Sequence, residues 1–142
     1  MILLDTNVVS ELMKSAPEPA VMAWINAIPG PTVFVSAVTQ AEILYGVALV
    51  PEGKRRQGLA QAARTAFEIY FRGRILPFDS EAAEAFAELA AARRQTGRPI
   101  SQADAQIAAI ARSRGAELAT RNVPDFEGCG VEVINPWVRA GA

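Results

Sequence analysis

The sequence lacks histidine altogether, and this absence removes several kinds of catalysis at once. It excludes a Ser-His-Asp triad, a Cys-His pair, a histidine general base and histidine-ligated zinc. The one cysteine, Cys129, cannot form an internal disulfide or a CxxC site. Any hydrolytic chemistry in this chain must therefore depend on carboxylates, and a hard metal ion is the cofactor that carboxylates bind best.

An excess of positive charge is also missing. The chain has 14 basic and 15 acidic residues and a formal net charge of −1, whereas a domain that grips duplex DNA by charge alone usually has a pI above about 9. The start of the chain has no basic segment, its first apolar run stops at Asp5, and no apolar run approaches the roughly 18 residues of a membrane span. We therefore expect a cytoplasmic protein without direct membrane contact.

Short apolar runs alternate with helical patterns over 142 residues, of which 51% are hydrophobic. Strands that are apolar throughout are typical of a parallel sheet covered on both faces. We expect one domain, residues 1–142, with an α/β fold in three layers (α/β/α) around a short, mostly parallel sheet. The expected strands cover residues 1–4, 32–36, 75–78, 117–119 and 131–134, and the expected helices cover 8–13, 21–28, 39–49, 54–71, 80–95 and 101–114.

Acidic residues recur where an expected strand or loop meets a helix. Asp5 follows the first strand, Glu42 lies one turn into the helix after the second, Asp104 lies in the first turn of the last helix, and Asp125 follows the fourth strand. Ligands of open α/β sheets bind at such junctions. Asp79, the remaining one of the four aspartates in the chain, begins an Ala/Glu-rich helix.

Each of these positions also has a purely structural explanation. The alternatives are helix capping for Asp5, capping boxes for Thr39-x-x-Glu42 and Ser101-x-x-Asp104, a turn after Pro124 for Asp125, and an ordinary helix start for Asp79.

Taken together, the acidic positions belong to a longer pattern of four blocks. The blocks are Leu4-Asp5-Thr6-Asn7, Ser36-x5-Glu42-x3-Gly46, Asp104-x2-Ile107-Ala108-Ala109 and Thr120-Arg121-Asn122-x2-Asp125-Phe126. In this order and spacing the sequence resembles the PIN-domain nucleases, and within them the FitB-like branch of the VapC family of bacterial toxins. The resemblance covers nearly the whole chain, including residues 74–79 and Asn135-Pro136-Trp137. None of the four acidic positions departs from the pattern.

The resemblance implies a Mg²⁺-dependent endoribonuclease that is the toxin of a type II toxin–antitoxin pair. Such an enzyme hydrolyses RNA to 5′-phosphate and 3′-hydroxyl ends. The resemblance also implies a homodimer and a small antitoxin protein whose C-terminal tail covers the active site. DNA would be bound only through the antitoxin. The apolar early helices and the region of Leu44 and Tyr45 are candidate contact surfaces.

If the four carboxylates converge, they repel one another. At about 5 Å and an effective dielectric constant of about 20, each ionised pair costs roughly 3 kcal/mol. Such a cluster either holds protons or binds a cation. Mg²⁺ fits oxygen ligands, and Mn²⁺ would fit the same site. We expect Asp5 and Asp104 to bind the metal directly, and Glu42 and Asp125 to act through water, orient the nucleophile or hold a second ion.

Short polar side chains accompany the acidic residues and can hydrogen-bond the carboxylates or a metal-bound water. For Asn7 and Ser36 a role in a turn or helix cap explains the residue equally well. Arg121 is expected to contact a substrate phosphate, whereas the other basic clusters are expected to be solvated helix faces. The supporting set is Thr6, Asn7, Ser36, Thr120 and Asn122.

Other classes fit less well. Haloacid phosphatases need a second aspartate two residues after the nucleophile, where this chain has Asn7, and receiver domains need a late lysine, whereas the only lysines are Lys14 and Lys54. A non-catalytic PIN-fold subunit of a DNA-binding toxin–antitoxin complex remains an alternative, although the intact acidic set argues against it.

Overall fold

The computed structural model describes residues 1–138 and contains a five-stranded sheet. Its strand order is β3-β2-β1-β4-β5, and every described pairing is parallel. The expectation of an α/β fold with a short, mostly parallel sheet is therefore confirmed. The strands are β1 (Ile2–Leu4), β2 (Val33–Ser36), β3 (Ile75–Leu76), β4 (Glu117–Ala119) and β5 (Val133–Ile134).

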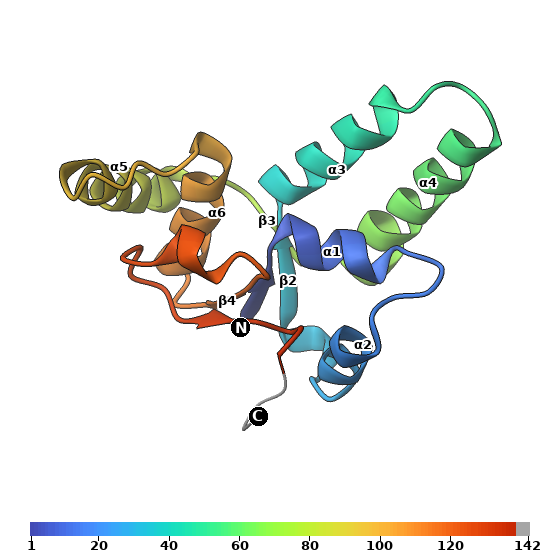
Figure 1. Ribbon diagram of the computed structural model, residues 1–142, viewed down its shortest axis with the longest axis horizontal. Coiled ribbons are helices and arrows are strands. Elements are labelled where there is room, and N and C mark those ends of the chain that lie inside the picture. The colour runs from blue at the N-terminus through green and yellow to red at the C-terminus, as the bar shows by residue number, and fades with distance from the viewer. Residues whose placement is uncertain (139–142) are drawn as a thin grey trace.

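Helices cover both faces of the sheet, as the three-layer prediction requires. In Figure 1, α5 and α6 lie on one side of the strands, and α1, α2 and the long hairpin of α3 and α4 lie on the other. The helices are α1 (Thr6–Leu12), α2 (Pro19–Asn26), α3 (Ala37–Leu49), α4 (Lys54–Thr65), α5 (Ser80–Gln95) and α6 (Gln102–Ser113).

The central strands are buried on both faces, which explains why they are apolar throughout. Leu3 and Leu118 point to the side of α5 and α6, and their neighbours Leu4 and Ala119 point to the opposite side. All four side chains are fully buried. This alternation follows from the two-residue period of a strand.

Several expected boundaries are wrong. The helix expected over 54–71 ends at Thr65 and continues as a π-helical turn, η2 (Ala66–Tyr70), in which the Phe71 N–H donates to the Ala66 carbonyl at 2.8 Å. The wider turn keeps Phe67 and Phe71 buried. The third and fifth strands are shorter than expected: Pro77 has no N–H for a ladder bond, and β5 begins only after Gly128 and Gly130, which both adopt positive φ.

The sheet has one point at which its connections reverse direction. From β1 the chain builds β2 and β3 on one side, and it then crosses to the other side for β4 and β5. The carboxyl ends of β1 and β4 are therefore neighbours at the position where open α/β sheets bind ligands. Among residues 1–138, no helix is long and apolar enough to cross a membrane.

Candidate active site

Asp5 lies at the carboxyl end of β1 and is held by hydrogen bonds to its backbone and to both carboxylate oxygens. Its N–H donates to the Ala119 carbonyl of β4 at 2.9 Å. Its Oδ1 accepts from the Thr6 N–H at 2.8 Å, and its Oδ2 accepts from the Thr120 hydroxyl at 2.7 Å and from the Asn7 amide at 3.2 Å. A carboxylate has about four acceptor positions, so one remains on Oδ1. Asp5 therefore caps α1 and keeps a lone pair for a ligand.

Asn7 and Thr120, from two separate segments of the chain, hold the Asp5 carboxylate in its orientation. The Asn7 Nδ2 donates to Asp5 and to the Thr120 Oγ1, the latter at 3.2 Å, and the Asn7 Oδ1 accepts from the Arg121 N–H at 3.2 Å. The Thr120 Oγ1 also accepts from the Asn122 N–H at 3.1 Å. Thr120 is fully buried. Both side chains thus link the end of β1 to the end of β4.

Glu42 is connected to Asp5 through Thr6. The Thr6 hydroxyl donates to the Glu42 Oε1 at 2.7 Å, and Thr39 lies 3.0 Å from the Thr6 Oγ1. Because the single hydroxyl proton of Thr6 goes to Glu42, Thr39 must be the donor of that second bond. Ser36 does not reach this network.

The capping box proposed for Thr39 and Glu42 is wrong. Ser36 is the N-cap of α3, since its Oγ accepts from the Thr39 N–H at 3.0 Å. Thr39 is therefore an interior helix residue, fully buried, and its hydroxyl is available for Thr6.

The other two carboxylates come from α6 and from a short 3₁₀ turn, η3 (Val123–Phe126). Ser101 caps α6, because its Oγ accepts from the Asp104 N–H at 3.2 Å, but the return bond of a capping box, from the Ser101 N–H to the Asp104 carboxylate, is not found among the described residues. The bond to the Ser101 Oγ uses only the backbone of Asp104 and places its half-buried side chain in the first turn of the helix. Asp125 is exposed, on η3 directly after β4.

The electrostatics of the site connect these carboxylates. Burial raises the pKa of Asp5, against the lowering effect of the Thr120 and Thr6 hydrogen bonds, and the charges of Asp104 and Glu42 raise it further. Burial also raises the pKa of Asp104; the charges of Asp125 and Glu42 add to this, while Ser101 and Arg93 oppose it. The charges of Asp104 and Glu42 thus act on Asp5, and those of Asp125 and Glu42 act on Asp104.

The donor set fits a hard divalent cation of the kind that uses few protein ligands. Residues 1–138 hold no group of three or more acidic, cysteine or histidine side chains arranged to bind a metal ion together. Mg²⁺, however, is usually held by one or two carboxylates, with waters and substrate phosphate completing its shell. Asp5, with its remaining Oδ1 lone pair, and Asp104 provide such a pair.

Arg121 and Asn122 contribute to the site in different ways. Arg121 is exposed to solvent, and its guanidinium lies over the ring of Trp137, 5.2 Å from the ring centroid, while its backbone N–H donates to Asn7. Asn122 contributes its backbone N–H to Thr120. A guanidinium stacked on tryptophan keeps its donors free for a ligand.

Two residues of the site had no signal in the sequence. Thr39 looked like a helix cap, and Arg93 belonged to a basic run typical of a solvated face. Arg93 is in fact buried, at 6% exposure, and its guanidinium donates to the backbone carbonyl of Asp125 at 2.7 Å. Each contact joins segments far apart in the chain, so local patterns carry no trace of it.

A parallel α/β sheet with acidic side chains at its switch point suits a carboxylate-based nuclease domain, and the comparison with known families agrees. The model of the PIN domain matches residues 2–125. The chain belongs to the PIN domain family, and within it to the VapC-family toxins.

The relatives cover almost the full chain. It is similar to VapC ribonuclease Y4jK of Sinorhizobium fredii, with 44% identity over 96% of this chain and 98% of the relative. It is also similar to toxin FitB of Neisseria gonorrhoeae, with 39% identity over 96% and 99%. Among solved structures, that of FitAB bound to an IR36 DNA fragment superposes with a TM-score of 0.91, 38% identity and coverage of 99% and 98%.

Proposed function

We propose that this VapC-family ribonuclease toxin of a type II toxin–antitoxin system hydrolyses RNA phosphodiesters with a divalent ion, Mg²⁺ or Mn²⁺, held by Asp5 and Asp104. The observation that carries the proposal is the buried Asp5 carboxylate, oriented by three hydrogen bonds and coupled to Asp104 at the switch point of the sheet. A pair of repelling carboxylates, one buried and one half-buried, is stabilised by a cation. Ribonuclease names among full-length relatives support the same chemistry.

The roles of the site residues follow from their contacts. A bound metal ion would lower the pKa of a coordinated water and neutralise charge on the phosphate. Thr6, Asn7 and Thr120 keep the Asp5 carboxylate in one orientation. Glu42, with Oε1 on Thr6 and Oε2 available, orients the attacking water and takes its proton. Asp125, on η3, acts through water. The products carry 5′-phosphate and 3′-hydroxyl ends.

The acidic cluster repels RNA, so basic residues must supply attraction. Arg121 is exposed, its backbone N–H is bound to Asn7, and its guanidinium is stacked on Trp137. We assign it to a phosphate next to the scissile bond. RNA as a substrate also accords with a cytoplasmic location.

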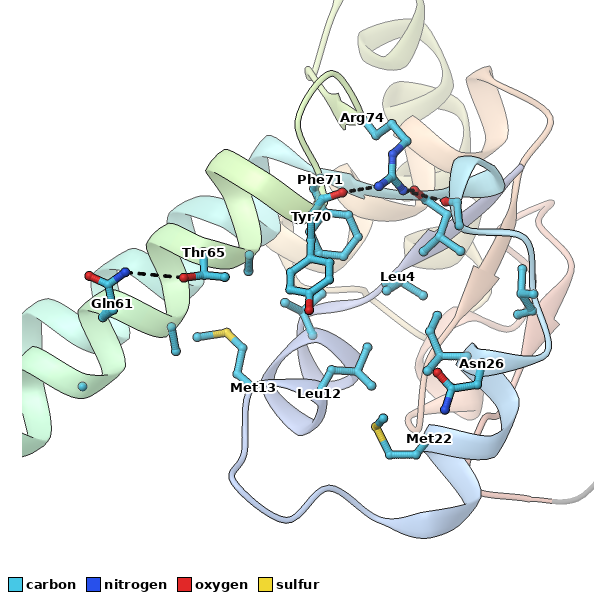
Figure 2. A pocket seen from close by; sticks show the side chains of 18 residues that line it. Leu4, Leu12, Met13, Met22, Asn26, Gln61, Thr65, Tyr70, Phe71 and Arg74 are labelled. Carbon is cyan, nitrogen blue, oxygen red and sulfur yellow. Dashed lines mark hydrogen bonds between the residues drawn. The ribbon is translucent and has the colours of Figure 1, made fainter.

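An apolar groove supplies a surface for the antitoxin. It has a volume of about 650 Å³ and lies between α1, α2, α4 and η2 (Figure 2), and none of the four acidic side chains lines it. Met13 and Met22 flank it, and α4 contributes small residues at Gly58 and Ala62. Arg74 closes one end through hydrogen bonds to the carbonyls of Gly30, Val33 and Tyr70. We propose that an apolar segment of the antitoxin occupies this groove.

Two further partners, DNA and a second copy of this chain, are assigned from the comparisons and from the exposed side chains. The FitAB structure contains DNA, which supports DNA binding by the toxin–antitoxin complex through the antitoxin. Leu44, Tyr45 and Leu49 of α3 are exposed at 47%, 67% and 66%. Three large apolar side chains exposed on one helix favour a homodimer contact there.

Cleavage of RNA by the purified chain tests the proposed function. With Mg²⁺ or Mn²⁺ we expect products with 5′-phosphate ends, and with excess EDTA no cleavage until metal is added back. Sequencing of RNA 5′ ends after induced expression would identify the target. Absence of cleavage under all these conditions would contradict the proposal and favour the non-catalytic alternative.

A further inference from the structure

Arg93 is a buried arginine whose guanidinium meets carbonyl oxygens and a thiol. It lies in the last turn of α5 and is 6% exposed. Among residues 1–138 it takes part in no ion pair; the four ion pairs found there involve other residues. Burying a charge is costly unless polar groups compensate it. The compensation at this position comes from the segment that carries Asp125.

The guanidinium forms hydrogen bonds to several residues of that segment. Its Nη1 donates to the carbonyls of Asp125 and Glu127, at 2.7 and 3.0 Å, and lies 3.7 Å from the Cys129 Sγ. Its Nε donates to the Arg98 carbonyl at 2.7 Å. One side chain thus connects the end of α5 to η3 and to the residues after it.

The same arginine also supports the segment that leads to Asp104. The Arg93 carbonyl accepts from the Arg98 N–H at 2.9 Å and from the Thr96 hydroxyl at 3.0 Å, just before Ser101 caps α6. Arg98 adds a second link, because its Nη2 donates to the Pro124 carbonyl of η3 at 3.2 Å. Asp104 and Asp125, from separate elements, therefore share one anchor.

We propose that Arg93 is a positioning residue that holds the η3 turn, and with it Asp125, against Asp104. The inference rests on the proposed function, because it assigns Asp125 to the metal site. A lysine keeps the positive charge but cannot bond to three separated carbonyls with a planar fork. Arg93→Lys therefore isolates the geometry from the charge, and Arg94→Lys is its matched control, since Arg94 is the exposed next residue on the same helix.

Two measurements test the proposal: the Kd for Mn²⁺ by calorimetry without RNA, and amide hydrogen exchange of residues 122–129 in the metal-free protein. We expect Arg93→Lys to weaken Mn²⁺ binding by roughly 10- to 100-fold and to speed exchange over η3, while Arg94→Lys changes neither. In a variant that remains folded, the apparent Kd equals the intrinsic Kd, so a role in stability alone would leave it unchanged.

Arg98→Gln provides a second variant in case Arg93→Lys does not fold, since the Arg98 side chain is 48% exposed. We expect Arg98→Gln to weaken Mn²⁺ binding and to speed exchange over η3, each by less than Arg93→Lys. An unchanged Kd in the folded variants, with or without faster exchange, would overturn the positioning role. A wild-type protein that binds no Mn²⁺ would instead overturn the proposed function, and the positioning role with it.

Discussion

Asp5→Asn is expected to reduce RNA cleavage by at least about 100-fold and to relieve the growth arrest caused by expressing the toxin. Loss of residues that merely orient metal ligands typically costs 10- to 100-fold, so loss of a ligand should cost more. The amide has only one acceptor oxygen and no charge, and its NH₂ would face the donors that now bind Oδ2, the Thr120 hydroxyl and the Asn7 amide. The readouts are initial cleavage rates and colony counts after induction.

Asp79→Asn is the matched control for this change. Asp79 is the N-cap of α5, where its Oδ1 accepts from the Ala82 N–H at 3.0 Å, and asparagine caps helices equally well. We expect cleavage and growth arrest close to wild type. Equal loss in both variants, or unchanged toxicity of Asp5→Asn, would contradict the assignment.

Asp104→Asn separates loss of function from loss of fold. Because burial raises the pKa of Asp104, its carboxyl stabilises the folded state below its unfolded pKa, and this contribution is lost as pH rises through the folded pKa. Without metal at neutral pH, the variant should therefore have an unfolding free energy at least equal to wild type, with its advantage shrinking on acidification. Its cleavage should fall as in Asp5→Asn. Lower stability at neutral pH would contradict this explanation.

Gly58→Leu is expected to weaken antitoxin binding by at least about 100-fold while RNA cleavage stays unchanged. A Cβ at Gly58 would meet no atom within 4 Å, so a larger side chain extends into the open groove without disturbing the core. Removal of a helical glycine adds up to about 1 kcal/mol of stability. Exclusion of an apolar segment worth roughly 3 kcal/mol corresponds to the stated loss. The measurement is the Kd for the co-encoded antitoxin, together with growth when both proteins are expressed.

Gly58→Ala serves as the control for the groove, because it makes the same helix-stabilising change with a single methyl group. We expect its antitoxin affinity to change only a few-fold, and growth to be restored by the antitoxin. If Gly58→Leu were neutralised as well as wild type, the antitoxin would bind elsewhere, for example on the exposed face of α3.

Local patterns were sufficient for the features that depend on one strand and its end. The apolar runs at residues 2–4 and 117–119 predicted buried parallel strands, and Asp5 and Thr120 are adjacent because these strands pair. The contact of Thr39 with Thr6 depends on how α3 packs against α1, and the burial of Arg93 depends on α5 meeting η3. Neither follows from spacing. The groove, likewise, is lined by residues of α1, α2, α4 and η2, and depends on how these elements come together.

The π-helical turn is another feature that the local sequence pattern does not predict. The sequence from 54 to 71 is a continuous helix former by composition, and only the need to bury both Phe67 and Phe71 against the sheet explains its widened end. Such tertiary demands override local propensity.

A crystal structure of the protein with Mn²⁺, using the anomalous signal of the metal, tests the central claim most directly. We expect one strong anomalous peak at coordination distance from the Asp5 Oδ1 and the Asp104 carboxylate, and no peak there in Asp5→Asn crystals grown in the same way. A peak bound by other residues, or none beside Asp5 at saturating Mn²⁺, would contradict the metal-dependent mechanism.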